Sequence, residues 1–201
     1  MIKTIIFDLG SVCFHINWLE INKEMVDKFG ITTLIRSCGN KKAEQYYDEF
    51  QEGKGKMEKV FAELNPECKN VNEAIEFYKN LYRKYKKTNE KIFDLIKKLK
   101  GHYKLICLTD TNQVHFDVYN EDKNLDIFDK VFTSFQLGMK KSNPQTFVKI
   151  LSELKINPKE LIFVDDNQKN IENAKLAGIN TIKFESNEKL IEDLRKSGVV
   201  I

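Results

Sequence analysis

From residue 89 onward, short apolar segments alternate with segments of helical periodicity, and this alternation is what most constrains the fold. Together with the apolar run near the N-terminus, the predicted strands are Ile2–Phe7, Lys104–Leu108, Lys130–Thr133, Leu161–Val164 and Asn180–Phe184. The predicted helices are Glu90–Lys100, a segment from about Asn112, Pro144–Leu154, Gln168–Ala177 and Glu188–Lys196. Strands that alternate with helices indicate an α/β fold with a parallel sheet covered on both faces.

Residues 15–87 interrupt this pattern, because they show helical periodicity and many aromatic side chains but no convincing strand. Gly53 and Gly55 mark one turn inside the segment, and Asn65-Pro66 marks another. We therefore expect a small helical bundle inserted after the first strand. In this division residues 15–87 form a cap over the carboxyl end of the first strand, and residues 1–14 with 88–201 form the core. The aromatic residues of the bundle, Trp18 included, are expected mostly in its interior, with one or two lining the cleft.

The composition argues against several classes of function. The 33 basic residues nearly balance the 30 acidic ones, so a net charge of +3 does not favour a nucleic-acid partner. The four cysteines form no C-x-x-C pair, which removes the common zinc and redox motifs. No apolar run approaches the length of a membrane span, and the N-terminus leads directly into a strand. We expect a cytoplasmic protein, and the sequence leaves open whether it is a monomer or a homodimer.

Polar side chains follow four of the predicted strands. They are Asp8, Thr109-Asp110, Lys141 (after a short loop) and Asp165-Asp166. Because the carboxyl ends of parallel strands lie at one edge of the sheet, these groups are expected to converge. A carboxylate nucleophile, a hydroxyl, an ammonium and an acidic pair suit phosphoryl transfer through an aspartyl-phosphate. Phosphate adds negative charge to this acidic site, so a hard cation such as Mg²⁺ is expected, with Asp8, a backbone carbonyl and Asp166 as ligands.

In order and spacing, these residues resemble the four motifs of the haloacid dehalogenase-like hydrolases, most of whose members are phosphatases. The matching segments are Phe7–Val12, Leu108–Asp110, Gly138–Pro144 and Phe163–Ile171, the last in the double-aspartate form. The resemblance covers the whole core and implies a Rossmann-like parallel sheet with a small helical cap inserted after the first strand. The first motif is most similar to a bacterial group with a "DLGxV" sequence, which includes sugar-1-phosphate phosphatases.

This resemblance implies a role for each matched residue. Asp8 is the expected nucleophile, and Thr109 and Lys141 are expected to hold the phosphoryl group. Asp166 is implied as the main Mg²⁺ ligand, with Asp165 beside it and the Gly10 carbonyl as a further ligand. The substrate-binding candidates are Gly10, Thr109, Asp110, Asn112, Lys141 and His15. The implied substrate is a small phosphorylated metabolite, for example a sugar phosphate.

The sequence departs from the family pattern at three positions. Gly10 stands where the family usually has an aspartate that protonates the leaving group, and glycine cannot move a proton. Removal of a general acid typically costs ~10²–10⁴-fold in rate. Asp110 replaces the usual asparagine of the second motif, and an acidic group near a phosphate is unfavourable unless it is protonated or paired. Ser142 replaces the usual proline after the lysine, which is a milder change.

Each candidate also has a plainer explanation. Asp8 could be a turn residue, Thr109 an ordinary strand end and Asp165-Asp166 a helix cap. Lys140 lies next to Lys141, so the two lysines could exchange roles. His15 could face the cap and contact substrate, and His115 could equally serve a structural hydrogen bond or a ligand.

Three functions are therefore compared. The first is a Mg²⁺-dependent phosphatase that uses Asp8 and favours good leaving groups. The second is a metal-independent haloacid dehalogenase, against which the acidic pair Asp165-Asp166 argues. The third is a binding or regulatory protein that has lost turnover, which the residues Gly10 and Asp110 suggest.

Overall fold

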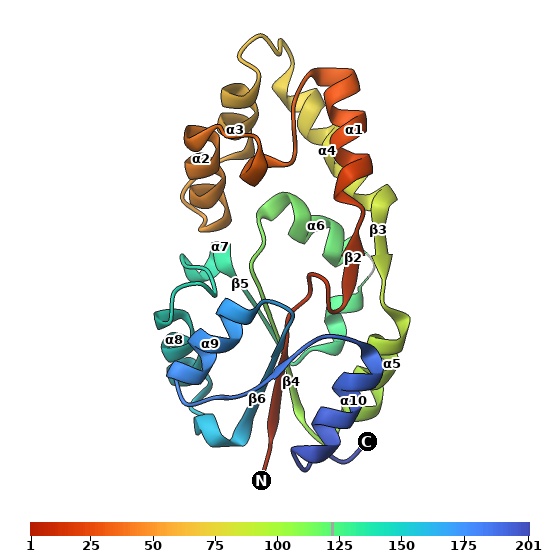
Figure 1. Cartoon of the computed structure of the whole chain (residues 1–201), viewed down its shortest axis with the longest axis vertical. Helices are drawn as coiled ribbons and strands as arrows, with labels where there is room; N and C mark the ends of the chain where they lie inside the picture. The colour runs from red at the N-terminus through yellow and green to blue at the C-terminus, as the bar shows by residue number, and fades with distance from the viewer. Residues whose placement is uncertain (122) are drawn as a thin grey trace.

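The core of the protein is a five-stranded parallel sheet in the strand order β5-β4-β1-β6-β7. The computed structural model describes residues 1–121 and 123–201 (Figure 1). The strands are β1 (Thr4–Phe7), β4 (Lys104–Thr109), β5 (Lys130–Thr133), β6 (Leu161–Asp165) and β7 (Asn180–Lys183). β1 lies at the centre, between β4 and β6, and the four motif-bearing strands β5, β4, β1 and β6 are consecutive in the sheet.

Helices cover both faces of this sheet (Figure 1). The helices that flank the sheet are α5 (Glu90–Leu99), α8 (Gln145–Leu154), α9 (Gln168–Leu176) and α10 (Asn187–Lys196). Two more, α6 (Gln113–Glu121) and α7 (Ser134–Leu137), lie near the carboxyl ends of the strands. Short 3₁₀ turns occur at η2 (Asn124–Ile127) and η3 (Pro158–Glu160). Strands and helices thus occur where the alternating pattern predicts them, with ends that differ by one or two residues.

The side chains of β1 alternate between two hydrophobic clusters, as a strand buried on both faces requires. Ile5 and Phe7 belong to a cluster that includes apolar residues of α5 and α10. Ile6 belongs to a second cluster, with Phe147 of α8 and Ile171 of α9. The first cluster continues into residues 15–87 and joins them to the sheet.

Residues 15–87 contain four helices that lie beyond the carboxyl ends of the strands, at the top of Figure 1. They are α1 (Trp18–Phe29), α2 (Lys41–Gln51), α3 (Met57–Leu64) and α4 (Val71–Tyr85), with the 3₁₀ turn η1 (Ile35–Ser37) before α2. Asparagine side chains at Asn17, Asn40 and Asn70 accept backbone N–H groups at the starts of α1, α2 and α4. We refer to residues 15–87 as the cap.

The chain enters and leaves the cap through a two-stranded antiparallel ribbon, in which β2 (Phe14–Ile16) pairs with β3 (Lys86–Thr88). The sequence pattern gave no strand here, because three residues are too few to show an alternation. The two crossings coincide with the ends of the predicted cap, so we propose the same division into cap and core.

The cap is docked on the core mainly through α4 and α6. The ion pairs are Lys79–Asp117 and Arg83–Glu121, and the buried hydroxyls of Tyr82 and Tyr119 bond to each other. Within the described part of the chain, no helix has both the length and the apolar composition needed to cross a membrane.

Candidate active site

The predicted site residues meet in one cavity at the carboxyl end of the sheet, between the core and the cap. The cavity has a volume of about 360 Å³. Its floor is lined by Asp8, Thr109, Asp110, Lys141 and Asp166. Gly10 and His15 also line it, whereas Asn112 and Asp165 lie behind the lining residues and are fully buried.

Lys141 is enclosed almost as fully as Asp165, with 2% of its side chain exposed. Its Nζ lies 2.6 Å from Asp8 Oδ1 and 2.7 Å from Asp165 Oδ2, so one ammonium bridges the ends of β1 and β6. The Lys141 backbone N–H donates to Asp110 Oδ1 at 2.9 Å. The Asn173 side chain donates to the Lys141 carbonyl at 3.1 Å, which fixes the backbone from the other side. The lysine is therefore held in place by residues of three motifs.

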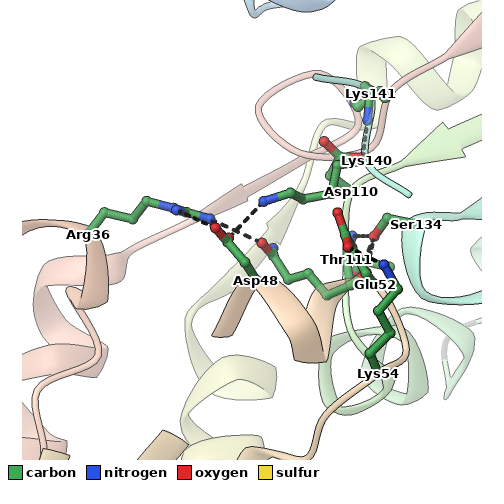
Figure 2. A network of polar contacts seen from close by, with 10 residues as sticks. Arg36, Asp48, Glu52, Lys54, Asp110, Thr111, Ser134, Lys140 and Lys141 are labelled. Atoms are coloured by element: carbon green, nitrogen blue, oxygen red, sulfur yellow. Dashed lines mark hydrogen bonds and ion pairs between the residues drawn. The ribbon is translucent and has the colours of Figure 1, made fainter. Parts of the chain in front are cut away.

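Lys140 points away from this group, which separates the roles of the two neighbouring lysines. Its Nζ pairs with Asp48 of α2 at 2.7 Å, and Arg36 pairs with the same carboxylate. Figure 2 shows Asp48 between Lys140 and Arg36, with Lys141 on the other side of the loop. Lys140 thus links the core to the cap, and Lys141 is the lysine placed at Asp8.

The charges around Lys141 shift the pKa values of its neighbours. Burial raises the pKa of Asp8 to about 7, although the Lys141 ammonium opposes this and Asp165 adds to it. Burial lowers the pKa of Lys141, but the carboxylates of Asp8, Asp165 and Asp110 outweigh burial and raise it above its usual range. Burial also raises the pKa of Asp110. Lys141 is therefore a permanent cation in a site that favours added positive charge.

Replacing Lys141 with methionine is expected to destabilise the protein by about 3–5 kcal/mol, because Asp8 and Asp165 would be left buried without their cation. The measurement is urea unfolding at pH 8 in the presence of a chelator. Lys140→Met is the matched control, and loss of its partly exposed pair with Asp48 should cost about 1 kcal/mol or less. Equal losses in the two variants would contradict the bridging role of Lys141.

Asp110 has a hydrogen-bond partner, which reduces the unfavourable effect of its negative charge near a bound phosphate. The carboxylate accepts the Lys141 N–H, and the raised pKa of Asp110 favours its protonated form more than in water. Behind it, the Thr111 N–H donates to Ser134 Oγ at 3.0 Å, and Ser134 Oγ donates to the Gln51 carbonyl of α2 at 2.7 Å. Figure 2 shows Thr111 and Ser134 next to Asp110. The second motif is therefore tied both to the lysine loop and to the cap.

The loop after Asp8 leaves open space where the family usually has its proton donor. A Cβ atom built on Gly10 would meet no atom within 4 Å. The Gly10 carbonyl accepts the Val12 N–H at 2.7 Å, and its second lone pair remains for another partner. Ser11 adopts a left-handed backbone with φ of 58°, which turns the chain into β2.

Asp8, Asp165 and Asp166 bring one carboxylate oxygen each within 4.8 Å of one another. Hard oxygen donors in such a group fit Mg²⁺. However, both Asp165 oxygens are engaged, because they accept from Lys141, from the Asn170 side chain at 3.2 Å and from the Asn167 N–H at 2.8 Å. Asp8 and Asp166 are therefore better placed to bind a cation, and direct ligation by Asp165 stays a prediction. Asn170, within the fourth motif, had not been singled out from the sequence.

His115 is a structural residue of the cavity wall. Its Nε2 lies 2.7 Å from the Tyr78 hydroxyl, and the Asn112 amide nitrogen lies 3.2 Å from its Nδ1. Asn112 Oδ1 accepts the His115 backbone N–H, which orients the amide so that it donates to Nδ1 and leaves the proton on Nε2. Burial lowers the pKa of His115 to about 3, so the ring is neutral. Asn112, predicted to bind substrate, holds this ring in place.

The buried His115 predicts a pH dependence of stability. Between its folded pKa of about 3 and the ordinary value near 6.5, the unfolded chain binds one more proton than the folded chain. Stability is therefore complete above that window and falls by about 1.4 kcal/mol per pH unit as the pH drops through it. In His115→Gln this part of the slope should vanish in urea unfolding measured from pH 7 to pH 4. The exposed His102, replaced by glutamine, is the matched control, and an unchanged slope in His115→Gln would contradict the prediction.

Comparison with known proteins agrees with the motifs. Residues 2–178 match the family described as haloacid dehalogenase-like hydrolase. The chain is 26% identical over 193 residues to a D-ribitol-5-phosphate phosphatase of Bacteroides thetaiotaomicron, covering 92% of this chain and 93% of that one. It is 24% identical over 179 residues to a sesquiterpene phosphatase of Aspergillus oryzae, covering 88% and 87% of the two chains.

A solved structure shares the fold. It is a haloacid dehalogenase family enzyme from Bacteroides thetaiotaomicron, an aspartate-to-alanine variant in complex with magnesium and inorganic phosphate. It superposes with a TM-score of 0.77 at 21% identity and covers 92% of this chain and 95% of that one. The parallel sheet with its inserted helices is thus an arrangement that other members of the family adopt.

Proposed function

Because the chain belongs to the haloacid dehalogenase-like hydrolases, we propose that it is a magnesium-dependent phosphatase of a small phosphorylated metabolite. One observation carries the proposal: Lys141 lies between Asp8 and Asp165, with Asp166 beside them and the cavity open above. This arrangement places a carboxylate, a fixed cation and a free second carboxylate around one position. It is the set of groups that phosphoryl transfer to an aspartate requires.

Asp8 attacks phosphorus with a carboxylate oxygen, the bond from phosphorus to the ester oxygen breaks, and the alcohol leaves as its alkoxide. Asp8 Oδ1 is held by Lys141, so Oδ2 is the oxygen left to attack. Lys141 and the Thr109 hydroxyl hold the phosphoryl oxygens in line for this attack. Water then attacks phosphorus, the bond from phosphorus to Asp8 breaks, and inorganic phosphate leaves, which returns Asp8 to its carboxylate form. The proton that the water loses balances the one that the alkoxide takes up from solvent.

The cation is proposed to bind to Asp8, Asp166 and the Gly10 carbonyl. When bound, Mg²⁺ supplies positive charge that offsets the charge of the phosphate. Asp166 is only partly buried and borders the cavity, so it can face both the cation and solvent. Asp165 orients Lys141 rather than the substrate, because its oxygens accept three donors already.

The missing proton donor limits which esters leave easily. With Gly10 in the first motif, no carboxyl group at that position can protonate the departing oxygen. We propose that the enzyme favours esters whose leaving group is stable as an anion, such as anomeric sugar phosphates, acyl phosphates and aryl phosphates. The two phosphatases named above act on a polyol phosphate and on a sesquiterpene, so likeness to them leaves the substrate class open.

The proposal is tested by assaying release of inorganic phosphate from a panel of phosphate esters, with Mg²⁺ and with a chelator. Activity is expected only with the metal. Asp166→Asn should raise the Mg²⁺ concentration for half-maximal activity by about tenfold or more, because a ligand is lost. Asp27→Asn, on the exposed face of α1, is the control. Turnover that persists in excess chelator would contradict the metal requirement.

The same panel distinguishes the two other functions considered from the sequence. A haloacid dehalogenase would release halide from a haloacid in the chelator and leave the phosphate esters intact. A binding protein without turnover would bind inorganic phosphate with Mg²⁺ but hydrolyse no ester. Neither function explains a cation-binding carboxylate beside the Lys141 bridge as directly as a phosphatase does.

A further inference from the structure

We propose that the part of the substrate beyond the phosphate is a compact, uncharged aromatic or alicyclic group, which the cap recognises through ring faces rather than hydrogen bonds. This inference rests on the proposed phosphatase function and adds the class of alcohol to it. It narrows the set of esters proposed above, because it would exclude polyol phosphates and sugar phosphates, the anomeric ones included, as the preferred substrates. It is carried by the wall of the cavity opposite the Asp8 floor.

Six side chains with rings contribute to that wall. We call it the aromatic wall, and its residues are Phe14, Trp18, Tyr47, Tyr82, His115 and Tyr119. Tyr82 and His115 stack in parallel, with ring centroids 4.1 Å apart and 4° between their planes. Trp18 leans on both, at 5.6 Å from Tyr82 and 5.7 Å from His115. The rings come from β2, α1, α2, α4 and α6, so cap and core build the wall together.

Trp18 is the member of the wall that remains open to a ligand. It stands at the first position of α1 and 38% of it is exposed, although it borders the cavity. It is also the one tryptophan of the chain. The floor of the cavity is polar, whereas Trp18 offers a large, partly exposed ring at its edge. Such a ring is suited to cover an apolar group of a bound molecule.

Four members of the aromatic wall, Tyr47, Tyr82, His115 and Tyr119, have polar atoms that already have partners. The Tyr82 and Tyr119 hydroxyls form a pair. Both nitrogens of His115 have partners, as described above. Burial raises the pKa of Tyr47 to about 12, and its hydroxyl interacts with Asn112. A hydroxyl group of a polyol buried against this wall would lose its water without gaining a partner, which weakens binding.

The charges of the cavity argue for an uncharged group. Among the described residues that line the cavity, Lys141 is the only lysine or arginine. Its ammonium is already shared by Asp8 and Asp165. The basic residues Arg36 and Lys140 are turned to Asp48, outside the lining. A second phosphate or a carboxylate on the substrate would therefore find no cation to pair with.

The volume of the cavity limits the size of the alcohol that can bind. This volume of about 360 Å³ also has to hold the phosphate. This is near the lower end of the sizes that ligand pockets show, so the alcohol is a group of roughly one or two rings. Ser11 and His15, which lie beside the wall, are exposed and keep their water when such a group binds. Gln51 also lines the cavity, and its side-chain oxygen accepts from Arg36 at 3.4 Å.

The test compares two esters of primary alcohols, so that leaving-group chemistry is similar and recognition of the alcohol differs. Benzyl phosphate is expected to show a kcat/KM about tenfold or more above that of D-ribitol 5-phosphate, with Mg²⁺ present. Trp18→Ala should lower kcat/KM for benzyl phosphate about tenfold, through KM, and leave the ribitol ester unchanged. Trp18→Phe keeps a ring and should restore most of the loss. Leu19→Ala, at a neighbouring site that is 71% exposed and outside the cavity, is the matched control.

Equal or higher kcat/KM for D-ribitol 5-phosphate would overturn the inference, as would an equal loss for both esters in Trp18→Ala. If neither of these esters nor 4-nitrophenyl phosphate is hydrolysed, the proposed phosphatase function is wrong. In that case a binding measurement still tests the inference about the aromatic wall. Because Trp18 is the sole tryptophan, its fluorescence reports on the wall. Benzylphosphonate is expected to change this emission and to bind at least about tenfold more tightly than D-ribitol 5-phosphate. No change in emission, or equal affinities, would overturn the inference.

Discussion

Asp8→Asn is expected to lower turnover of every phosphate ester by roughly 10⁴-fold or more, because the amide cannot accept the phosphoryl group. Asparagine has the shape of aspartate, so the Lys141 Nζ can still contact its oxygen and the cavity is kept. The substitution removes the nucleophile and one cation ligand while leaving Asp165 paired with Lys141. The loss should therefore appear in kcat for good and poor leaving groups alike.

The measurement is release of inorganic phosphate at saturating Mg²⁺, together with a search for the covalent intermediate. In the wild-type protein, a rapidly quenched reaction should show the mass of one added phosphoryl group on the peptide that contains Asp8. Asp8→Asn should show none, while its urea unfolding transition stays cooperative. Asp27→Asn is again the control for an aspartate distant from the site. Residual turnover within tenfold of the wild type would rule out Asp8 as the acceptor.

The parallel sheet and its helical cover followed from the sequence, because each strand is a short apolar run beside a helix with its own period. The order of the strands was not predicted. Ile5, Ile6 and Phe7 are apolar in succession, which fits a strand buried on both faces, and the structure puts them in both hydrophobic clusters. The convergence of Asp8, Thr109 and Asp166 followed from the parallel direction alone. The ribbon of β2 and β3 did not, because its two halves lie about seventy residues apart and each is three residues long.

The partners inside the site could not be predicted, because they depend on how side chains of different motifs face each other. The sequence placed Lys141 near the phosphate but did not show that Asp165 would be its second carboxylate partner. The sequence indicated that the negative charge of Asp110 would be unfavourable near a phosphate, whereas in the structure that carboxylate accepts the Lys141 N–H. Spacing along the chain gives the edge of the sheet on which a residue lies, and packing of the loops decides which groups touch.

The aromatic wall shows a second limit of periodicity. Tyr82 and Tyr119 have the spacing of interior helix residues, and they are indeed buried. A ring that packs against another helix and a ring that borders a cavity both lie on the inner face of their helix. The spacing of apolar residues along the helix is therefore the same in the two cases. Only the docking of α4 on α6 shows that these rings also line the space above Asp8. The substrate class that we propose could therefore not be predicted from the sequence pattern.

Gly10→Asp is expected to raise kcat for esters with poor leaving groups by ~10²–10⁴-fold, because it supplies the proton that the departing alkoxide lacks. The local structure permits the change. Gly10 has no positive φ, and a Cβ at this position meets no atom within 4 Å. The new carboxyl group would border the same cavity as Asp8 and Asp166, which Gly10 already lines.

The expected gain depends on the leaving group, and this dependence identifies its cause. Hydrolysis of benzyl phosphate, an alkyl ester, should accelerate strongly, whereas 4-nitrophenyl phosphate, whose leaving group is stable as an anion, should change little. Gly10→Asn matches the size of the new side chain without offering a proton, and it should give no comparable gain. A gain of the same size for both esters, or in Gly10→Asn, would mean that the glycine limits the geometry of the site rather than proton transfer.

The same variant should bind phosphate less tightly, which separates proton donation from a general improvement of the site. A fourth carboxylate beside Asp8, Asp165 and Asp166 adds negative charge where the phosphate binds, and like charges at short range repel. KM should therefore rise while kcat rises more, and the rise in KM should shrink at lower pH, where the new carboxyl group is protonated. An increase in kcat for alkyl esters together with a lower KM at every pH would contradict this account of Gly10.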